Sequence, residues 1–417
     1  MQRLTARDVR RQNRVAVDPE TLTIAAEIVE AVRSEGEAAV RRFGEKYGDL
    51  ERGAELVIDR TELDRALDRI TGAESDLLGR TARRIEVFAR AQRESLSEVT
   101  LDVDGGRMGQ RIAPVTRAGC YAPGGRYPLP SSVLMTAVTA RVAGVRHVIV
   151  ASPRPATVTL AAAAIAGADG VLSVGGAHAI AALAFGLENL EPCEIVVGPG
   201  NRWVTAAKQL VSGTVGIDML AGPSELVVLA DESADSAVVA ADLLAQAEHD
   251  ADALPVLVTT SGRLATSVER AIEQQLADLP TRTVARAALE NGFVVVVTDI
   301  DTAVAVCDRL APEHLQVMTR EPERVAARLD HWGGLFVGSG SAEVLGDYGV
   351  GPNHTLPTGG VARFRGGLSV FDFLRVRTWL EIDDPVAARG MTEDAVTLAR
   401  LEGLEAHARA AERRLEN

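Results

Sequence analysis

From about residue 112 onward, the chain alternates short apolar runs with stretches of helical periodicity. The apolar runs include HVIVASP, GVLSVGG and EIVVGPG, and the segments between them include SSVLMTAVTARVAG, TVTLAAAAIAG and AHAIAALAFG. Strands that are buried on both faces lose the alternation of apolar and polar residues, so this rhythm predicts βαβ units around a parallel sheet. The rhythm continues to about residue 225.

A second set of apolar runs follows, namely SELVVLAD, LPVLVTTS, FVVVVTD, HLQVMT and GLFVGSG, again with helical segments between them. Before residue 100 the apolar positions recur at helical spacing with charges between them. This pattern predicts packing helices, one of which is expected to begin at Thr61 as its N-cap. After GGLSVFDFL no further strand is predicted, and MTEDAVTLARLEGLEAHARAAERRLEN is expected to be a helical tail.

The predicted fold class is α/β, with two Rossmann-like domains that contain parallel-rich sheets, a helical N-terminal segment and a small helical C-terminal tail domain. A length of 417 residues favours two or three domains. The predicted division is an N-terminal arm over 1–16, a discontinuous main α/β domain over 17–118 and 226–367, an inserted Rossmann-like domain over 119–225, and a tail over 368–417.

Composition excludes several classes of protein. A net charge of −14 argues against binding to a polyanion such as a nucleic acid. The N-terminus MQRLTARDVRRQNRVAV has no apolar core of a secretory signal, and no run reaches the ~18 apolar residues of a membrane span. Cys120, Cys193 and Cys307 are far apart and form no CxxC, which argues against a disulfide framework and fits a reducing cytoplasm. Each is interpreted as a small buried apolar residue rather than a nucleophile.

Glycine-containing loops follow three of the predicted strands. They are CYAPGG with Gly124 and Gly125, VGGAHAI with Gly175 and Gly176, and VGPGN with Gly198 and Gly200. Sites in α/β sheets form at the carboxyl ends of strands, and a glycine loop before a helix favours an anion such as a pyrophosphate. None of the loops is a GxGxxG, and in GSGSAE the third glycine position holds Glu343. Tight structural turns explain each loop equally well.

Four of the seven histidines stand near carboxylates or an amide, in AQAEHD, APEHLQ, GDYGVGPNHTLPTGG and EGLEAH. Imidazole and carboxylate groups bind zinc, and positions three apart on a helix, such as Gln246 and His249, face the same way. The adjacent Glu313 and His314 suit acid–base chemistry. A solvated helix end and a capped turn after Pro312 are the structural alternatives for these two pairs.

The same motifs, together with GPGNRWVTAAKQLVSGTVGIDMLAGPSELVVLAD, occur in an order that resembles the histidinol dehydrogenase family over nearly the whole chain. The resemblance implies a zinc enzyme that oxidises L-histidinol to L-histidinaldehyde and then to L-histidine while it reduces two NAD+. It also implies a homodimer in which the C-terminal tail of one subunit completes the site of the other.

By motif, the resemblance assigns the zinc ligands to Gln246, His249, Asp347 and His407, which thereby also contact the substrate. The catalytic pair becomes Glu313, which activates water, and His314, which also contacts the substrate. Further substrate contacts fall on Ser224, His354 and Glu402, and NAD contacts fall on Tyr121, His178 and Asn201. His178 stands where the family often has glutamine, so that contact is altered.

Two other functions use the same residues. A zinc hydrolase would use the ligands to activate water, and a non-catalytic member of the fold would bind a ligand or assemble with a partner. Formation of NADH from NAD+ and histidinol separates the dehydrogenase from both.

Overall fold

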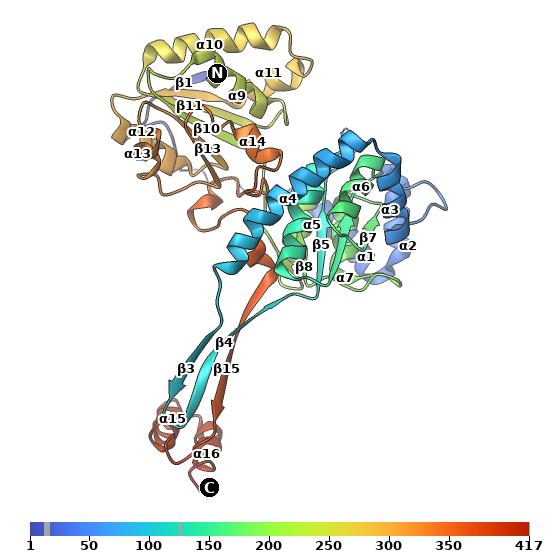
Figure 1. The fold of residues 1–417 in the computed structure, drawn as a ribbon, viewed down its shortest axis with the longest axis vertical. Coiled ribbons are helices and arrows are strands. Elements are labelled where there is room, and N and C mark those ends of the chain that lie inside the picture. Colours follow the sequence, from blue (N-terminus) through green and yellow to red (C-terminus); the bar gives the residue numbers. More distant parts are fainter. Residues whose placement is uncertain (12–16, 125–126, 417) are drawn as a thin grey trace.

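The computed structural model describes residues 1–11, 17–124 and 127–416. Two α/β units lie side by side, and a long arm projects away from them and carries the C-terminus at its tip (Figure 1). The predicted Gly125 and residues 12–16 of the predicted N-terminal arm lie outside the described residues.

The first unit contains a six-stranded sheet in the order β2-β7-β6-β5-β8-β9. Its strands are β2 (Val57–Asp59), β5 (Arg117–Tyr121), β6 (His147–Ala151), β7 (Gly170–Leu172), β8 (Ile195–Val197) and β9 (Gly216–Ile217). All pairs are parallel except β2 with β7. Four helices connect the parallel strands: α5 (Pro130–Ala143), α6 (Thr157–Ile165), α7 (Gly176–Phe185) and α8 (Arg202–Val211).

The four N-terminal helices also belong to the first unit. They are α1 (Pro19–Glu35), α2 (Glu37–Tyr47), α3 (Arg60–Arg69) and α4 (Gly72–Glu94). Helices α3 and α4 share a core with α5 and α6, whereas α1 and α2 share a second core with α7 and α8. The predicted grouping of 17–118 with 226–367 is therefore wrong, because these helices bury their apolar faces against the other sheet.

The second unit contains six strands, all parallel, in the order β1-β12-β11-β10-β13-β14. They are β1 (Gln2–Leu4), β10 (Glu225–Ala230), β11 (Leu254–Thr259), β12 (Phe293–Val296), β13 (His314–Met318) and β14 (Gly334–Val337). Helices α9 (Ser236–Ala247), α10 (Gly262–Ala277) and α11 (Arg282–Asn291) share one core, and α12 (Ile300–Leu310) and α13 (Pro322–Ala326) belong to the other. Because β1 pairs with β12, the start of the predicted N-terminal arm is an edge strand of this sheet.

The arm is an antiparallel sheet of β3 (Val99–Val103), β4 (Gly106–Pro114) and β15 (Leu374–Ile382), followed by α15 (Arg389–Leu401) and α16 (Glu405–Glu412). Two short 3-10 helices, η1 (Val361–Arg363) and η2 (Val370–Phe373), precede β15. The tail over 368–417 is therefore helical only in part, since β15 extends the sheet for nine residues.

Local signals explain most helix boundaries. Thr71 and Glu74 form a capping box at the start of α4. The predicted N-cap at Thr61 is wrong, because the Asp59 carboxylate instead accepts from the backbone of Glu62 and starts the helix two residues earlier. The α/β class with two parallel-rich sheets is confirmed.

In both units the five parallel strands that follow each other in sequence have the order 3-2-1-4-5, with a switch point between β5 and β8 and between β10 and β13. Such switch points are where open α/β sheets form sites. The chain passes from the carboxyl end of β9 to the amino end of β10 through residues 218–224. This short connection brings the carboxyl edge of the first sheet against the amino edge of the second.

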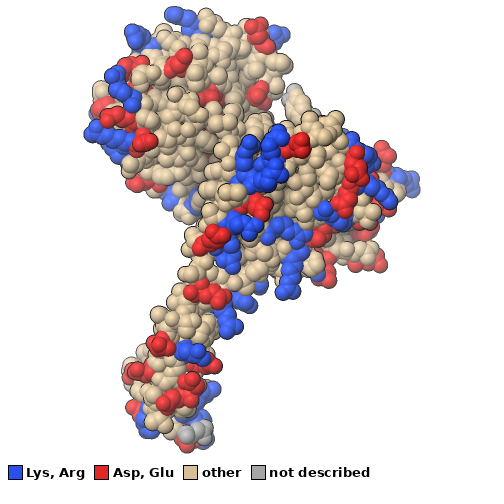
Figure 2. Space-filling model, in the orientation of Figure 1, with Lys and Arg blue, Asp and Glu red and all other residues tan. Residues whose placement is uncertain are grey.

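Basic and acidic side chains are mixed over both units and the arm on the face that Figure 2 shows, and the blue groups in that view are bordered by red ones. Among the helices of the described residues, none combines the length and apolar character that a membrane span requires.

Candidate active site

A cavity of about 180 Å³ lies between the two sheets. Its walls from the first unit include Pro123 after β5 and Pro199 after β8. The walls from the second unit contain seven of the predicted site residues: Ser224, Gln246, His249, Glu313, His314, Asp347 and His354. Of these, Ser224, Glu313 and His314 lie at the amino ends of β10 and β13, not at the carboxyl ends where the sequence analysis placed sites in α/β sheets. The other four come from the end of α9 and from the segment 347–354.

The backbone of one residue, Glu225, orients the predicted catalytic pair. The backbone N–H of Glu225 donates to Oε2 of Glu313 at 2.8 Å, and the backbone carbonyl of Glu225 lies 2.9 Å from Nδ1 of His314. A carbonyl oxygen only accepts, so Nδ1 carries the proton and Nε2 keeps its lone pair. The register of β10 and β13, in which Leu226 is opposite His314, creates this arrangement.

Burial sets the protonation of this pair. It raises the pKa of Glu313 well above its usual range, although the N–H of Glu225 opposes the shift. Burial lowers the pKa of His314 and keeps its imidazole neutral, against the opposing charge of Asp347. A neutral imidazole with a free Nε2 is suited to accept a proton.

The predicted metal ligands of α9 and α14 (Glu343–Asp347) converge on the same cavity. His249 Nε2 lies 3.4 Å from Asp347 Oδ2, and its pKa is raised by that hydrogen bond. Gln246 is 0% exposed, and neither its oxygen nor its nitrogen has a partner among the residues that the structure describes. A buried amide without a partner normally costs stability, so an unfilled ligand position explains Gln246 better than a solvated helix end does.

His354 lies at the edge of the same cavity and contacts both units. Its Nδ1 lies 2.9 Å from the backbone carbonyl of Asp347, and its Nε2 lies 3.3 Å from Oγ of Ser132 in the first unit. The ring therefore bridges the two units at the edge of the cavity. Burial lowers the pKa of His354 and favours the neutral form.

Two of the predicted residues lie elsewhere in the chain. Glu402 follows α15 and His407 lies on α16, and both are exposed at the tip of the arm, remote from the cavity (Figure 1). Within one chain, the structure does not bring Glu402 and His407 close to the other predicted metal and substrate contacts, which are Ser224, Gln246, His249, His314, Asp347 and His354.

The three predicted NAD-binding residues line a second cavity of about 300 Å³ in the first unit, together with Arg154 and Trp203. The hydroxyl of Tyr121 accepts from the backbone of Gly176 at 3.2 Å, and the side chain of Asn201 caps α8. Because Tyr121 precedes Pro123 and Asn201 follows Pro199, the two cavities lie at opposite sides of the same loops.

His178 is enclosed at the back of this second cavity. Its ring centre lies 6.1 Å from that of Phe43 and 6.0 Å from that of Tyr47, and its Nε2 lies 3.5 Å from the carboxylate of Asp49. These three neighbours come from α2 and its C-terminal end, a segment that the sequence analysis assigned only to packing. Of the two rings, Tyr47 also lines the cavity, and no motif indicated it.

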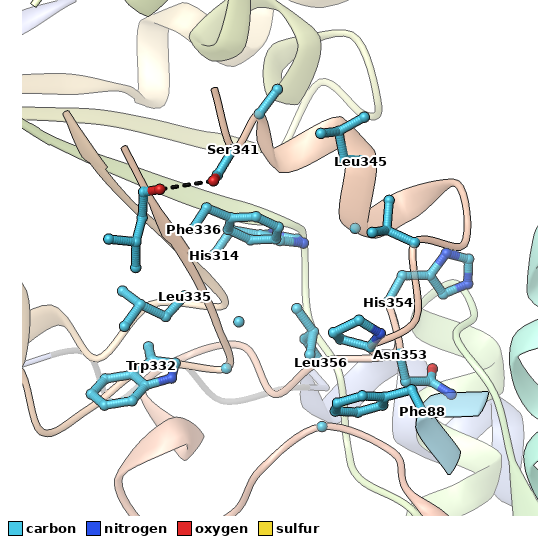
Figure 3. Close-up of a pocket in the computed structure, with 18 of the residues that line it drawn as sticks. Phe88, His314, Trp332, Leu335, Phe336, Ser341, Leu345, Asn353, His354 and Leu356 are labelled. Atoms are coloured by element: carbon cyan, nitrogen blue, oxygen red, sulfur yellow. Dashed lines mark hydrogen bonds between the residues drawn. The ribbon is translucent and has the colours of Figure 1, made fainter. Parts of the chain in front are cut away.

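A third cavity of about 610 Å³ reaches His314 and His354 from another side. Figure 3 shows Trp332 and Leu335 on one side of it and Phe88 on the other, with Phe336 beside His314. The ring centres of Phe336 and His314 are 6.1 Å apart. This apolar wall keeps the imidazole away from water on the β14 side.

Sequence reasoning missed Glu343 as a site residue and treated it only as a failed glycine position. With His314 and Asp347 it forms a group whose potential ligand atoms all lie within 4.8 Å of one another. The available signal was the spacing of four residues between Glu343 and Asp347, which places two carboxylates on one helix face.

The three cysteines do not reach the cavity and are all buried, as predicted. Burial raises the pKa of Cys120 and of Cys193 to about 12 and raises that of Cys307 further. A buried thiol with a raised pKa is a poor nucleophile.

Known proteins of one family resemble this chain over nearly its whole length. A model of the histidinol dehydrogenase family matches residues 11–415. A histidinol dehydrogenase from Parasynechococcus marenigrum is 46% identical over 93% of this chain and 90% of its own, and one from Thermus thermophilus is 45% identical over 95% of both chains.

A crystal structure of histidinol dehydrogenase from Elizabethkingia anophelis superposes with a TM-score of 0.91 at 31% identity, and the match covers 100% of this chain and 98% of the other. The chain therefore belongs to the histidinol dehydrogenase family, whose members are oxidoreductases of histidine biosynthesis.

Proposed function

We propose that this enzyme oxidises L-histidinol to L-histidine in two NAD+-dependent steps, through L-histidinaldehyde, at a zinc site shared by two subunits. The observation that supports this most directly is the backbone of Glu225, whose N–H and carbonyl hold a buried carboxyl and a neutral imidazole in one cavity. We place the enzyme in the cytoplasm, because its three cysteines are buried thiols without a disulfide.

The residues present fit a divalent metal ion. An unpartnered amide, an imidazole and a carboxylate, from Gln246, His249 and Asp347, line the same cavity. Zinc accepts these oxygen and nitrogen donors, and His407 of a second copy is the fourth proposed ligand. When bound, the ion supplies an anchor for the imidazole and amine of histidinol, which are good zinc ligands.

In the first step, His314 accepts the proton of the substrate hydroxyl at Nε2, because Nδ1 is already committed to Glu225. The loss of this proton and of a hydride converts RCH2OH and NAD+ into RCHO, NADH and H+. Ser224, His354 and Glu402 are proposed to hold the substrate while this occurs. Of these, Ser224 and His354 line the cavity in one chain.

In the second step, Glu313 activates a water molecule that adds to the aldehyde. Deprotonated Glu313 takes a proton from the water, the loss of a second hydride to NAD+ leaves the carboxylic acid of histidine, and this acid releases its proton to give the carboxylate. Its backbone partner keeps one oxygen occupied at 2.8 Å, so the other oxygen is the one we assign to water.

NAD+ is proposed to bind in the cavity that contains Tyr121, His178 and Asn201, and it accepts the hydride in each step. The shared loops 121–123 and 199–201 lead from this cavity to the catalytic one. An imidazole at position 178 donates one hydrogen bond at most when neutral, where glutamine donates two. Its enclosure by Phe43 and Tyr47 supports a contact through the ring face instead.

We infer a homodimer because the cavity of one chain lacks the proposed zinc ligand His407 and the proposed substrate contact Glu402. His407 and Glu402 are exposed at the tip of an arm that also exposes apolar side chains, including Val376, Leu380 and Leu401. Apolar surface that is exposed in one chain is normally covered in an assembly. Two-fold symmetry would place each tip at the cavity of the partner.

The decisive experiment follows absorbance at 340 nm with NAD+ and L-histidinol, with and without a chelator. Two NADH per histidinol, lost on chelation and restored by zinc, is the expected result. Absence of NADH together with zinc-dependent hydrolysis of an ester or amide would replace the proposal with the hydrolase alternative.

A further inference from the structure

Glu343 is a carboxylate in an unusual environment. It is 0% exposed, and neither of its oxygens has a hydrogen-bond partner among residues 1–11, 17–124 and 127–416. Buried carboxylates are ordinarily paired with a cation or with several donors, because an isolated charge loses its hydration. Something that the chain itself does not provide must therefore compensate Glu343.

The atoms around Glu343 are electron-rich. Oε1 of Glu343 lies 3.5 Å from Nε2 of His314, and that same nitrogen lies 4.0 Å from Oδ1 of Asp347. Nδ1 of His314 donates to the carbonyl of Glu225, so the neutral ring presents a lone pair to both carboxylates. Three acceptors that face one point repel each other unless a cation or a proton lies between them.

The two helices beside Glu343 carry the proposed metal ligands of this chain. Gln246 and His249 come from the end of α9, and Asp347 follows Glu343 by one turn on α14. Asp347 places a second negative charge within 4.8 Å of Glu343. The free carboxylate is thus costly in this position without a positive charge.

We propose that Glu343 is a fifth residue of the metal centre, a carboxylate that supplies the second negative charge for a divalent cation. This inference rests on the proposed metal site and extends it, since Gln246, His249, Asp347 and His407 carry only one negative charge among them. With Glu343 the protein neutralises both charges of the ion, so the affinity for the metal depends on residue 343.

The test measures metal affinity directly, with zinc alone and a chromogenic chelator as competitor, on the full-length protein. Glu343→Gln preserves shape and removes the charge, and we expect it to weaken zinc binding about 10–100-fold, as loss of a supporting group at a metal site does. The matched control is Asp242→Asn on α9, because Asp242 is also a buried acid with an unpartnered oxygen but does not belong to the group of potential ligands that Glu343 forms with His314 and Asp347. The control is expected to keep wild-type affinity within about threefold, well short of the change expected at residue 343.

Thermal melting provides a second readout. Glu343→Gln should leave the metal-free protein at least as stable, because a neutral amide needs no counter-charge in this buried position, and it should shrink the rise in melting temperature that zinc produces. A carboxylate with a purely structural role gives the opposite result, a lower melting temperature and unchanged zinc affinity, and that result would overturn the inference. An effect of equal size in Asp242→Asn would also overturn it.

If Glu343→Gln does not fold, Glu343→Asp replaces it, since this variant keeps the charge and withdraws it by one methylene. The zinc affinity of Glu343→Asp should be lower than that of wild type. A folded Glu343→Asp that binds zinc as tightly as wild type would count against the inference. A wild-type protein that takes up no zinc at all would overturn the metal part of the proposed function, whereas equal affinity of wild type and Glu343→Gln overturns this inference alone.

Discussion

Lys208 and Asp218 form an ion pair inside the first unit, where their side chains are 3% and 0% exposed. Both bind the backbone of Gly198, since Nζ of Lys208 donates to the Gly198 carbonyl at 2.9 Å and the Gly198 N–H donates to Asp218 at 2.7 Å. Gly198 has a φ of 119°, and a Cβ at this position would lie 2.0 Å from the carbonyl of Tyr121. The pair thus fixes the loop that carries Asn201.

Lys208→Met should therefore destabilise the protein by about 3–5 kcal/mol, because it leaves the charge of Asp218 buried without a partner. The loop should also shift, so KM for NAD+ is expected to rise more than KM for histidinol. Chemical denaturation and steady-state kinetics measure the two effects. The double variant Lys208→Met/Asp218→Leu removes both charges and should recover most of the stability; a double variant as unstable as the single one would contradict this explanation.

Glu313→Gln should slow aldehyde oxidation about 10²–10⁴-fold, while alcohol oxidation falls much less, because only the second step needs water to lose a proton. The pKa of Glu313 is raised, and the working base is the deprotonated form. The wild-type rate of aldehyde oxidation should therefore increase as the pH rises through that pKa, and the variant should lose this dependence. Single-turnover measurements with each substrate separate the steps, and equal losses in both would refute the assigned role.

Simultaneous replacement of Cys120, Cys193 and Cys307 by alanine should leave substantial activity. All three thiols are buried, and burial raises the pKa of each. The expected cost is a modest loss of stability from the smaller side chains. Circular dichroism identifies folded protein, and a folded triple variant without activity would restore a thiol mechanism.

A mixed dimer tests whether the tail acts in trans. A His249→Asn chain and a His407→Asn chain, each with its own tag, are co-expressed, and the mixed dimer is purified by both tags. If each arm completes the partner's cavity, one site collects both mutations and the other collects both native histidines. The mixed dimer should then have about half of wild-type activity, whereas each variant alone is inactive.

Completion of the site within a single chain predicts a different outcome for the same mixed dimer. Every site would then carry one mutation, and the preparation would be inactive and poor in zinc. That result would remove the shared site and leave the reaction itself standing.

The sequence was sufficient for the parallel strands and the catalytic cavity, and insufficient for the arm. Runs such as SELVVLAD and HLQVMT are apolar because both sheet faces are buried, and they became β10 and β13. Strand β15 has the sequence LRVRTWLEI and is mostly exposed, so it lacks the burial pattern that identifies a strand. Its partner β4 contains no buried residue, so it lacks that pattern as well.

The sequence also did not indicate which helices and sheets pack against each other. The apolar stripe of α1 contains Ile28 and Val32, which indicates that a face is buried but not which sheet covers it. Likewise, Glu343 lies on a five-residue helix whose position is set by β14 and α9 and not by its own periodicity. Glu313 and His314 line the same cavity, but the partner they share is the backbone of Glu225, which no side-chain motif reveals.

The nine residues of β15 pair one to one with β4, from Leu374 opposite Pro114 to Ile382 opposite Gly106. At about 3.3 Å per residue, the paired strands are ~30 Å long, and this length sets the distance of α15 and α16 from the two units. Removing two residues from each of β4 and β15 would shorten the reach by about 7 Å and leave every side chain on its face. Removing one residue from each strand would move the side chains beyond the deletion to the opposite face of the sheet. The length of this protein's arm can therefore change only by an even number of residues per strand.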